Sequence, residues 1–193
     1  MTTRRQEIVD AAKRIIASRG MAALTVRKLA QELKVTDGSL YRHFKSKKEI
    51  ISLLIEDIET TLLMTIEAAA EQGRDPLGRL RAVLFSHISY AEQRKGLTLL
   101  LINEVVSLKD VQLQKKMRGV VEQYLKKIRA ILEEGVTGKV FRKNLDVEHA
   151  SLAFFGLVQS LIIFWSLSGF SFAITKKRVE ALFDIYSEGI IRK

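Results

Sequence analysis

Hydrophobic residues recur along most of the chain with the spacing of amphipathic helices. In the first such segment the apolar positions lie on one helix face, at Ile8, Ala11, Ala12, Ile15 and Ile16. Gly20 is expected to end this helix, because glycine adopts the left-handed conformation at little cost. Thr25 is then expected to cap a short helix whose apolar positions are Val26, Leu29, Ala30 and Leu33.

A turn at residues 34–36 separates this short helix from a second one, expected over about 37–44. Ser46 opens a long helix, because Ser46 and Glu49 have the spacing of a capping box. Its apolar stripe continues at Ile51, Leu54, Ile55, Ile58 and Leu62. Further helices are expected over about 76–94, 97–108, 110–134 and 146–169, and from about 175 onwards.

The chain shows no strand-like alternation and no internal repeat, and Pro76 is its single proline. The pattern therefore predicts an all-α protein of about nine helices. Residues 150–175 carry no charge, so by length they could span a membrane. Gln159, the serines and the glycines of this stretch favour the alternative, the buried centre of a soluble helical bundle.

Positive charge is concentrated at the start of the chain. Residues 1–50 hold 12 Lys/Arg and 5 Asp/Glu, so most of the net charge of +10 lies in the first quarter. A basic end on a nearly balanced body predicts a polyanion as partner, although a solubilising surface has the same composition. The absence of cysteine fits a reducing cytoplasm, and the charged first residues do not form a secretory signal.

The two short helices and their turn describe a helix-turn-helix. Lys28 lies in the first turn of the first short helix, where the helix dipole disfavours a cation unless an anion lies nearby. Lys47 and Lys48 repeat this arrangement at the start of the long helix. These lysines are either phosphate ligands or ordinary surface residues. Two capped helix starts flanking the same short helix favour phosphate binding.

The second short helix begins with small polar residues, which let its backbone approach the edges of DNA bases. Leu40 and Phe44 would anchor it to a hydrophobic core. Tyr41, Arg42 and His43 add groups able to contact DNA. Tyr41 could instead pack internally and His43 could lie at the edge of the core, but their neighbours favour phosphate contact.

The segment LTVRKLA at 24–30, followed by VTDGSLYRHFKSKKE at 35–49, resembles the signature of TetR-family regulators. This resemblance covers about residues 4–55 and implies that Thr25, Lys28, Tyr41, His43 and Lys47 hold phosphates. It also implies that Thr36, Asp37, Ser39 and Arg42 face the bases, while Gly38 permits close approach. Lys34 stands where the family usually has glycine. A left-handed Lys34 would cost on the order of 1 kcal/mol, or it could add a phosphate contact.

The resemblance further implies a helix-turn-helix domain at 1–48 and an effector-binding and dimerisation domain at 49–193. Gly156 and Ser160 would let helices approach closely, and the last helix has a continuous apolar face. Together they would form a four-helix seam between two subunits. A homodimer would place its recognition helices about 34 Å apart on double-stranded DNA, which predicts a palindromic operator.

Four polar residues on otherwise apolar segments are candidates for an effector pocket: His87, Asn103, Tyr124 and Gln159. Each could equally be a hydrogen-bonded polar group of the interior. The surrounding Leu, Ile and Phe residues suggest a small hydrophobic effector, which would release a repressor from its operator.

The chain has no glycine-rich phosphate loop and no metal-spaced cluster, and its three histidines are far apart. We therefore expect no enzyme, no cofactor and no metal site. The remaining alternatives are a ligand-independent repressor and a non-specific architectural DNA-binding protein. The latter would bind with strong salt dependence and little sequence preference.

Overall fold

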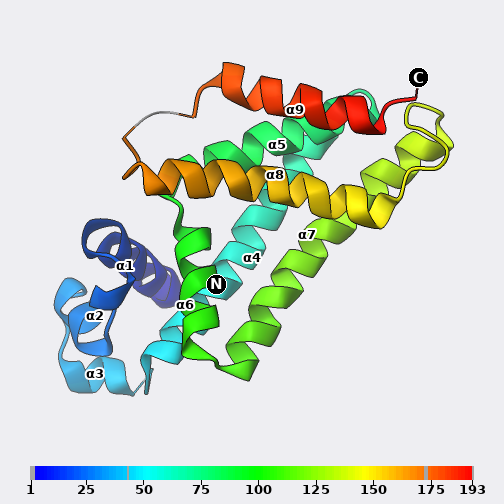
Figure 1. Cartoon of the computed structure of the whole chain (residues 1–193). Coiled ribbons are helices and arrows are strands. Elements are labelled where there is room, and N and C mark those ends of the chain that lie inside the picture. The colour runs from blue at the N-terminus through cyan, green and yellow to red at the C-terminus, as the bar shows by residue number, and fades with distance from the viewer. Residues whose placement is uncertain (1–2, 43, 172–173, 193) are drawn as a thin grey trace. The chain divides into compact units, whose positions relative to one another are not determined.

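The computed structural model describes residues 3–42, 44–171 and 174–192, apart from the side chains of Thr3 and Tyr41. Within these residues the chain forms nine α-helices and one short 3₁₀ helix, with no β-strand, which confirms the all-α prediction (Figure 1). The elements are α1 (Thr3–Arg19), η1 (Met21–Ala23), α2 (Val26–Glu32), α3 (Asp37–Tyr41), α4 (Lys47–Gln72), α5 (Pro76–Gln93), α6 (Leu97–Leu108), α7 (Val111–Thr137), α8 (Val147–Leu167) and α9 (Lys176–Ile190).

The helices divide into two compact units. Unit 1 comprises residues 1–60 and 94–120, and unit 2 comprises residues 61–93 and 121–193. The domain boundary predicted at residue 48 lies inside unit 1, which also includes α6 and the start of α7.

Unit 1 is built on the apolar faces that the spacing predicts. The predicted face of α1 is buried, as are Val26, Leu29 and Ala30 of α2. Leu40 is the buried anchor of α3. Because α1, α2 and α3 share this small core, the two short helices hold each other in place.

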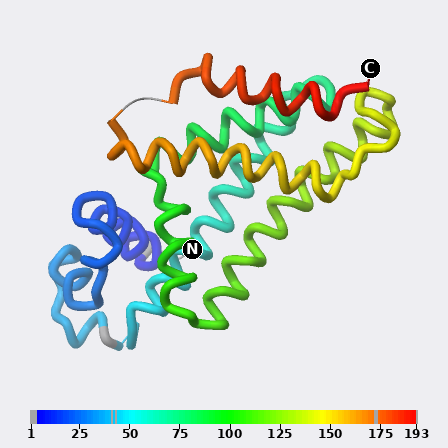
Figure 2. The backbone as a smooth tube through the Cα atoms, in the orientation of Figure 1, coloured from blue at the N-terminus to red at the C-terminus, as the bar shows by residue number. Residues whose placement is uncertain are grey.

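Unit 2 has its own core. In Figure 2 α8 and α9 run beside α5, and all three helices are in contact. Its largest fully buried side chains are Tyr124, Phe141, Phe154 and Phe183. The sequence pattern predicted that α7 ends near Gly135, but the helix continues to Thr137. The Phe141 ring occupies the space that a Cβ at Gly135 would need, so the helix requires glycine inside its last turns.

Capping explains most helix starts. Thr25, Asp146 and Thr175 each accept a hydrogen bond from the third backbone N–H that follows, as predicted for Thr25. The capping box at the start of α4 differs from its prediction, because the Glu49 carboxylate accepts from the backbone N–H of Lys45, one residue before Ser46. The second short helix is also shorter than predicted, since α3 ends at Tyr41.

Several helices end on a left-handed lysine. Lys34 has φ 55°, so the conformation expected of the family's usual glycine is adopted by a residue that carries a Cβ. Lys95, Lys109 and Lys139 also have positive φ, each within two residues of a helix end. At Lys34 and Lys139, paired backbone hydrogen bonds close the helix end in a Schellman motif.

Helix α8 is the one helix of the described chain that is long and apolar enough to cross a membrane, but such a helix is also common in soluble cores. A third of its most apolar window is buried. Several of its large apolar side chains are instead exposed.

Candidate DNA-contact surface and effector pocket

The start of α3 forms an exposed, capped helix N-terminus. Thr36 Oγ1 accepts from the backbone N–H of Ser39 at 3.3 Å, which fixes the entry of the chain into the helix. Thr36, Asp37 and Gly38 are exposed and Ser39 is half-buried. Because Leu40 on the opposite face is fully buried, these polar residues are presented outward by an anchored helix.

The start of α2 is organised in the same way. Thr25 Oγ1 accepts from the Lys28 backbone N–H at 3.0 Å, and Thr25 itself is exposed. The Lys28 ammonium donates to Gln31 Oε1 at 3.2 Å on the same helix. Arg42 is exposed directly after α3. His43 and the side chain of Tyr41, both predicted to hold phosphates, lie outside the described residues.

The lysines at the start of α4 have acidic partners within unit 1. Lys47 Nζ lies 2.8 Å from Glu104 Oε1 on α6, and it also donates to the Met21 carbonyl oxygen at 3.0 Å. Lys48 Nζ lies 2.7 Å from Asp110 Oδ2, just before α7. The sequence indicated the lysines but not these partners. An isolated acid in the otherwise apolar segment 97–108 was the available signal for Glu104.

Further along α4, ion pairs join it to α1 and α7. Lys13 Nζ lies 2.6 Å from Asp57 Oδ2, and Asp57 is only 3% exposed. Glu56 binds two cations, Arg5 at 2.8 Å and Lys116 at 2.5 Å. Because the Asp57 carboxylate is buried, removing Lys13 from the Lys13–Asp57 pair would cost on the order of several kcal/mol. These ion pairs tie α1 and the start of α7 to the first half of α4.

Two of the predicted pocket residues contact each other in the interior of unit 2. His87 Nδ1 lies 3.2 Å from Tyr124 Oη, within hydrogen-bond distance, and both side chains are buried. Burial lowers the pKa of His87 to about 4, so the imidazole is neutral at physiological pH. Burial also raises the pKa of Tyr124, which keeps its hydroxyl protonated. Tyr124 in turn packs edge-on against Phe155.

The other two predicted pocket residues lie elsewhere. Asn103 is exposed on α6, which belongs to unit 1, and Gln159 is half-buried on α8 of unit 2. Their assignment to an effector site stays a prediction.

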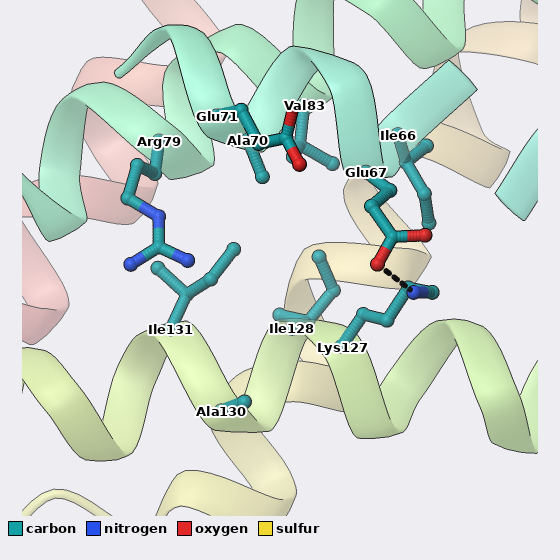
Figure 3. Close-up of a pocket in the computed structure, with 10 residues that line it drawn as sticks. All are labelled: Ile66, Glu67, Ala70, Glu71, Arg79, Val83, Lys127, Ile128, Ala130 and Ile131. Atoms are coloured by element: carbon teal, nitrogen blue, oxygen red, sulfur yellow. Dashed lines mark ion pairs between the residues drawn. The ribbon is translucent and has the colours of Figure 1, made fainter. Parts of the chain in front are cut away.

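Unit 2 contains a pocket of about 330 Å³ formed by α4, α5 and α7 (Figure 3). In Figure 3 the side chains of Ile128 and Ile131 point from α7 into the space opposite Val83. Charged side chains surround this apolar centre. Lys127 pairs with Glu67 at 3.1 Å, and Arg79 pairs with Glu134 on α7. The residues lining the pocket are Ile66, Glu67, Ala70, Glu71, Arg79, Val83, Lys127, Ile128, Ala130 and Ile131.

None of these ten lining residues was among the four predicted to line an effector pocket. Their apolar members belong to ordinary helix faces, and their charged members look like solvated surface. No periodicity distinguishes a helix face that lines a pocket from one that fills a core.

Comparison with known proteins identifies the class. Residues 8–54 match the model for bacterial regulatory proteins of the tetR family, and residues 73–170 match a tetracyclin repressor-like C-terminal domain. The chain is 33% identical over 134 residues to the nucleoid occlusion factor SlmA of Vibrio vulnificus, covering 69% of this chain and 68% of that protein.

Solved structures share the fold over nearly the whole chain. The regulator FadR of Bacillus subtilis in complex with stearoyl-CoA has a TM-score of 0.84 at 23% identity, covering 96% of this chain and 98% of that one. A transcriptional regulator from Saccharomonospora viridis in complex with choline has a TM-score of 0.85 at 18% identity and covers all of both chains. At these identities the likeness establishes the fold.

The chain therefore belongs to the TetR family of DNA-binding transcriptional regulators, as its helix-turn-helix segment predicted. The proteins of this class regulate through DNA binding and are not enzymes.

Proposed function

We propose that the protein is a sequence-specific transcriptional repressor that binds a palindromic operator as a homodimer. The observation that carries this proposal is the exposed, Thr36-capped start of α3, held outward by the buried Leu40. An exposed polar helix end on a fixed scaffold is what major-groove recognition requires.

Each residue of this surface has a proposed role. Thr36, Asp37, Ser39 and Arg42 contact base edges, and Thr25, Lys28, Tyr41, His43 and Lys47 contact phosphates. Gly38 supports close approach, because a Cβ built there would have no atom within 4 Å and the position is open to a partner. Lys34 is exposed beside this surface and could add a phosphate contact.

The homodimer is supported by an apolar surface on unit 2. Leu152 is 54% exposed, Phe164 59% and Leu167 80% on α8, and Ile185 is 69% exposed on α9. Gly156 lies between the first two along α8, is exposed, and has open space around its Cβ position. Large exposed apolar side chains around a small residue favour close packing of a second copy. The apolar character of α8 thus serves dimerisation, consistent with a cytoplasmic regulator.

A small hydrophobic effector is proposed to bind in unit 2. The apolar centre of the pocket in Figure 3 supports this class of ligand. Effector binding would favour a state of lower operator affinity, which requires different affinities of the effector for the two states. Stearoyl-CoA and choline are suitable probes, because the similar structures contain them. A hydrophobic effector site predicts that stearoyl-CoA releases operator DNA and that choline does not.

The DNA-binding proposal is tested by selecting bound duplexes from random sequence with the purified protein. The expected product is an inverted repeat whose half-site centres lie about 34 Å apart along the duplex. A pool without a shared motif, bound with a steep salt dependence, would instead identify a non-specific architectural protein.

Replacing Arg42 by alanine is expected to change base preference, because a guanidinium discriminates guanine by paired hydrogen bonds worth about 1–3 kcal/mol. The measurement is the same selection repeated with the variant. Lys28→Ala is the matched control, since loss of a phosphate contact weakens binding to all sequences alike. It also reduces the slope of log affinity against log salt concentration by about 0.9. If the Arg42→Ala variant selects the same DNA motif as the wild type, Arg42 does not discriminate between bases.

A second candidate function is nucleoid occlusion, favoured by the 33% identity to SlmA over two thirds of both chains. A role linked to the nucleoid as a whole requires binding sites distributed over the chromosome, whereas a repressor needs operators at a few promoters. Mapping the bound positions on the chromosome of the source bacterium distinguishes the two.

A further inference from the structure

We propose that Glu104 and Asp110 compete with DNA phosphates for the lysines at the start of α4 and thereby lower the affinity of the protein for DNA. This inference rests on the proposed DNA binding and adds a restraint built into unit 1. All four residues belong to that unit.

Lys47 is held on two sides. Its ammonium lies 2.8 Å from Glu104 Oε1 and donates to the Met21 carbonyl oxygen at 3.0 Å. An ammonium has three donors, so one remains for a further acceptor. Glu104 is itself largely shielded from water, with 21% of its side chain exposed, which strengthens its attraction for the cation. A phosphate that approaches Lys47 therefore meets a cation whose charge is already balanced.

Lys48 is held by a carboxylate with a fixed position. Asp110 Oδ1 caps α7 by accepting from the backbone N–H groups of Gln112 and Leu113, both at 3.1 Å. Its second oxygen, Oδ2, lies 2.7 Å from Lys48 Nζ. The hydrogen bond from Lys48, with that from the Leu113 N–H, holds the pKa of Asp110 below its ordinary value, so the carboxylate stays charged at neutral pH.

The two pairs act on the same end of one helix. Lys47 and Lys48 occupy the first turn of α4, and the N–H groups at the start of a helix attract anions. A carboxylate at each lysine cancels the positive charge that would otherwise reinforce this N-terminus. Counterion release on DNA binding depends on cations that are free to neutralise phosphates, so paired lysines contribute less to affinity.

The test compares the wild type with Glu104→Gln/Asp110→Asn. Both replacements keep the shape of the side chain, and the new asparagine can still cap α7 through its amide oxygen. Binding is measured across salt concentrations on an operator duplex and on a scrambled duplex of equal length. We expect the variant to bind both duplexes about 3- to 10-fold more tightly, with a slope of log affinity against log salt steeper by about 1–2.

The control is Glu148→Gln/Asp184→Asn, which makes the same change of charge in unit 2 at residues paired with Arg129 and Arg81. A gain confined to Glu104→Gln/Asp110→Asn supports competition, and an equal gain in the control overturns it as a general charge effect. Unchanged or weaker binding by a variant with wild-type melting temperature also overturns it, because the carboxylates then only position α4. The single variant Glu104→Gln, which leaves the α7 cap intact, must change in the same direction.

Failure of the underlying function is distinguishable in the same experiment. A wild type that binds neither duplex at low salt overturns both proposals. A wild type that binds, with a variant that binds no better, overturns the competition alone.

Discussion

Replacing Phe164 by glutamate is expected to produce a monomer and to lower operator affinity by about 10²- to 10⁴-fold. Phe164 lies on the exposed apolar face of α8, near Leu167. A two-fold interface contains the same residue from both subunits, so two glutamates would be carried into an apolar contact. The Arg178 guanidinium of the same subunit, 5.8 Å from the centre of the Phe164 ring, would offset this cost only in part. Two helix-turn-helix modules then bind their half-sites independently, and the gain from linking them is lost.

The oligomeric state is measured by sedimentation, and operator affinity by titration of a labelled duplex. Met64→Glu is the matched control, because Met64 is a comparably exposed apolar residue of unit 2 on α4. It should leave the dimer and the affinity unchanged. A Phe164→Glu protein that still sediments as a dimer would place the subunit interface on another surface.

The second large effect is a loss of stability in acid that depends on His87. Its pKa is lowered to about 4 in the folded protein by burial, against about 6.5 in the unfolded chain. Above pH 6.5 both states are neutral and His87 has no effect. As the pH falls from 6.5 to 4, only the unfolded state gains the proton, so the free energy of unfolding decreases by about 1.4 kcal/mol per pH unit.

Urea unfolding at pH 7 and at pH 4.5 measures this effect. His87→Gln keeps a group that can bond Tyr124 but cannot take up the proton. The loss of stability between the two pH values should be about 2–3 kcal/mol smaller in the His87→Gln variant than in the wild type. Equal losses would show that His87 is solvated or protonated in the folded state.

The helix-turn-helix could be predicted from sequence because its determinants are local. Thr25, Gly20 and the apolar spacing of α1 act within one or two helical turns, and the structure has each helix close to its predicted place. The errors are also local. The end of α7 was misplaced because Gly135 accommodates the ring of Phe141, a contact that no helix periodicity encodes.

The pocket and the acidic partners of the α4 lysines were not predictable in the same way. Glu104 and Asp110 are separated from Lys47 and Lys48 by more than 50 positions, and only folding brings the charges together. His87 and Tyr124 were selected as polar residues on apolar faces, and the structure brings them together as a buried pair. Whether an effector reaches them depends on cavity shape, which residue type alone does not determine.

The four lysines with left-handed backbone conformation at helix ends have a consequence for engineering. Each carries a conformational cost of about 1 kcal/mol that glycine would not carry. Lys109 and Lys139 belong to neither the proposed base-reading surface nor the lining of the pocket. Replacing Lys109 and Lys139 by glycine would therefore raise the thermal stability of the protein. A biosensor built from it could use these replacements without a change in the DNA or effector that it recognises.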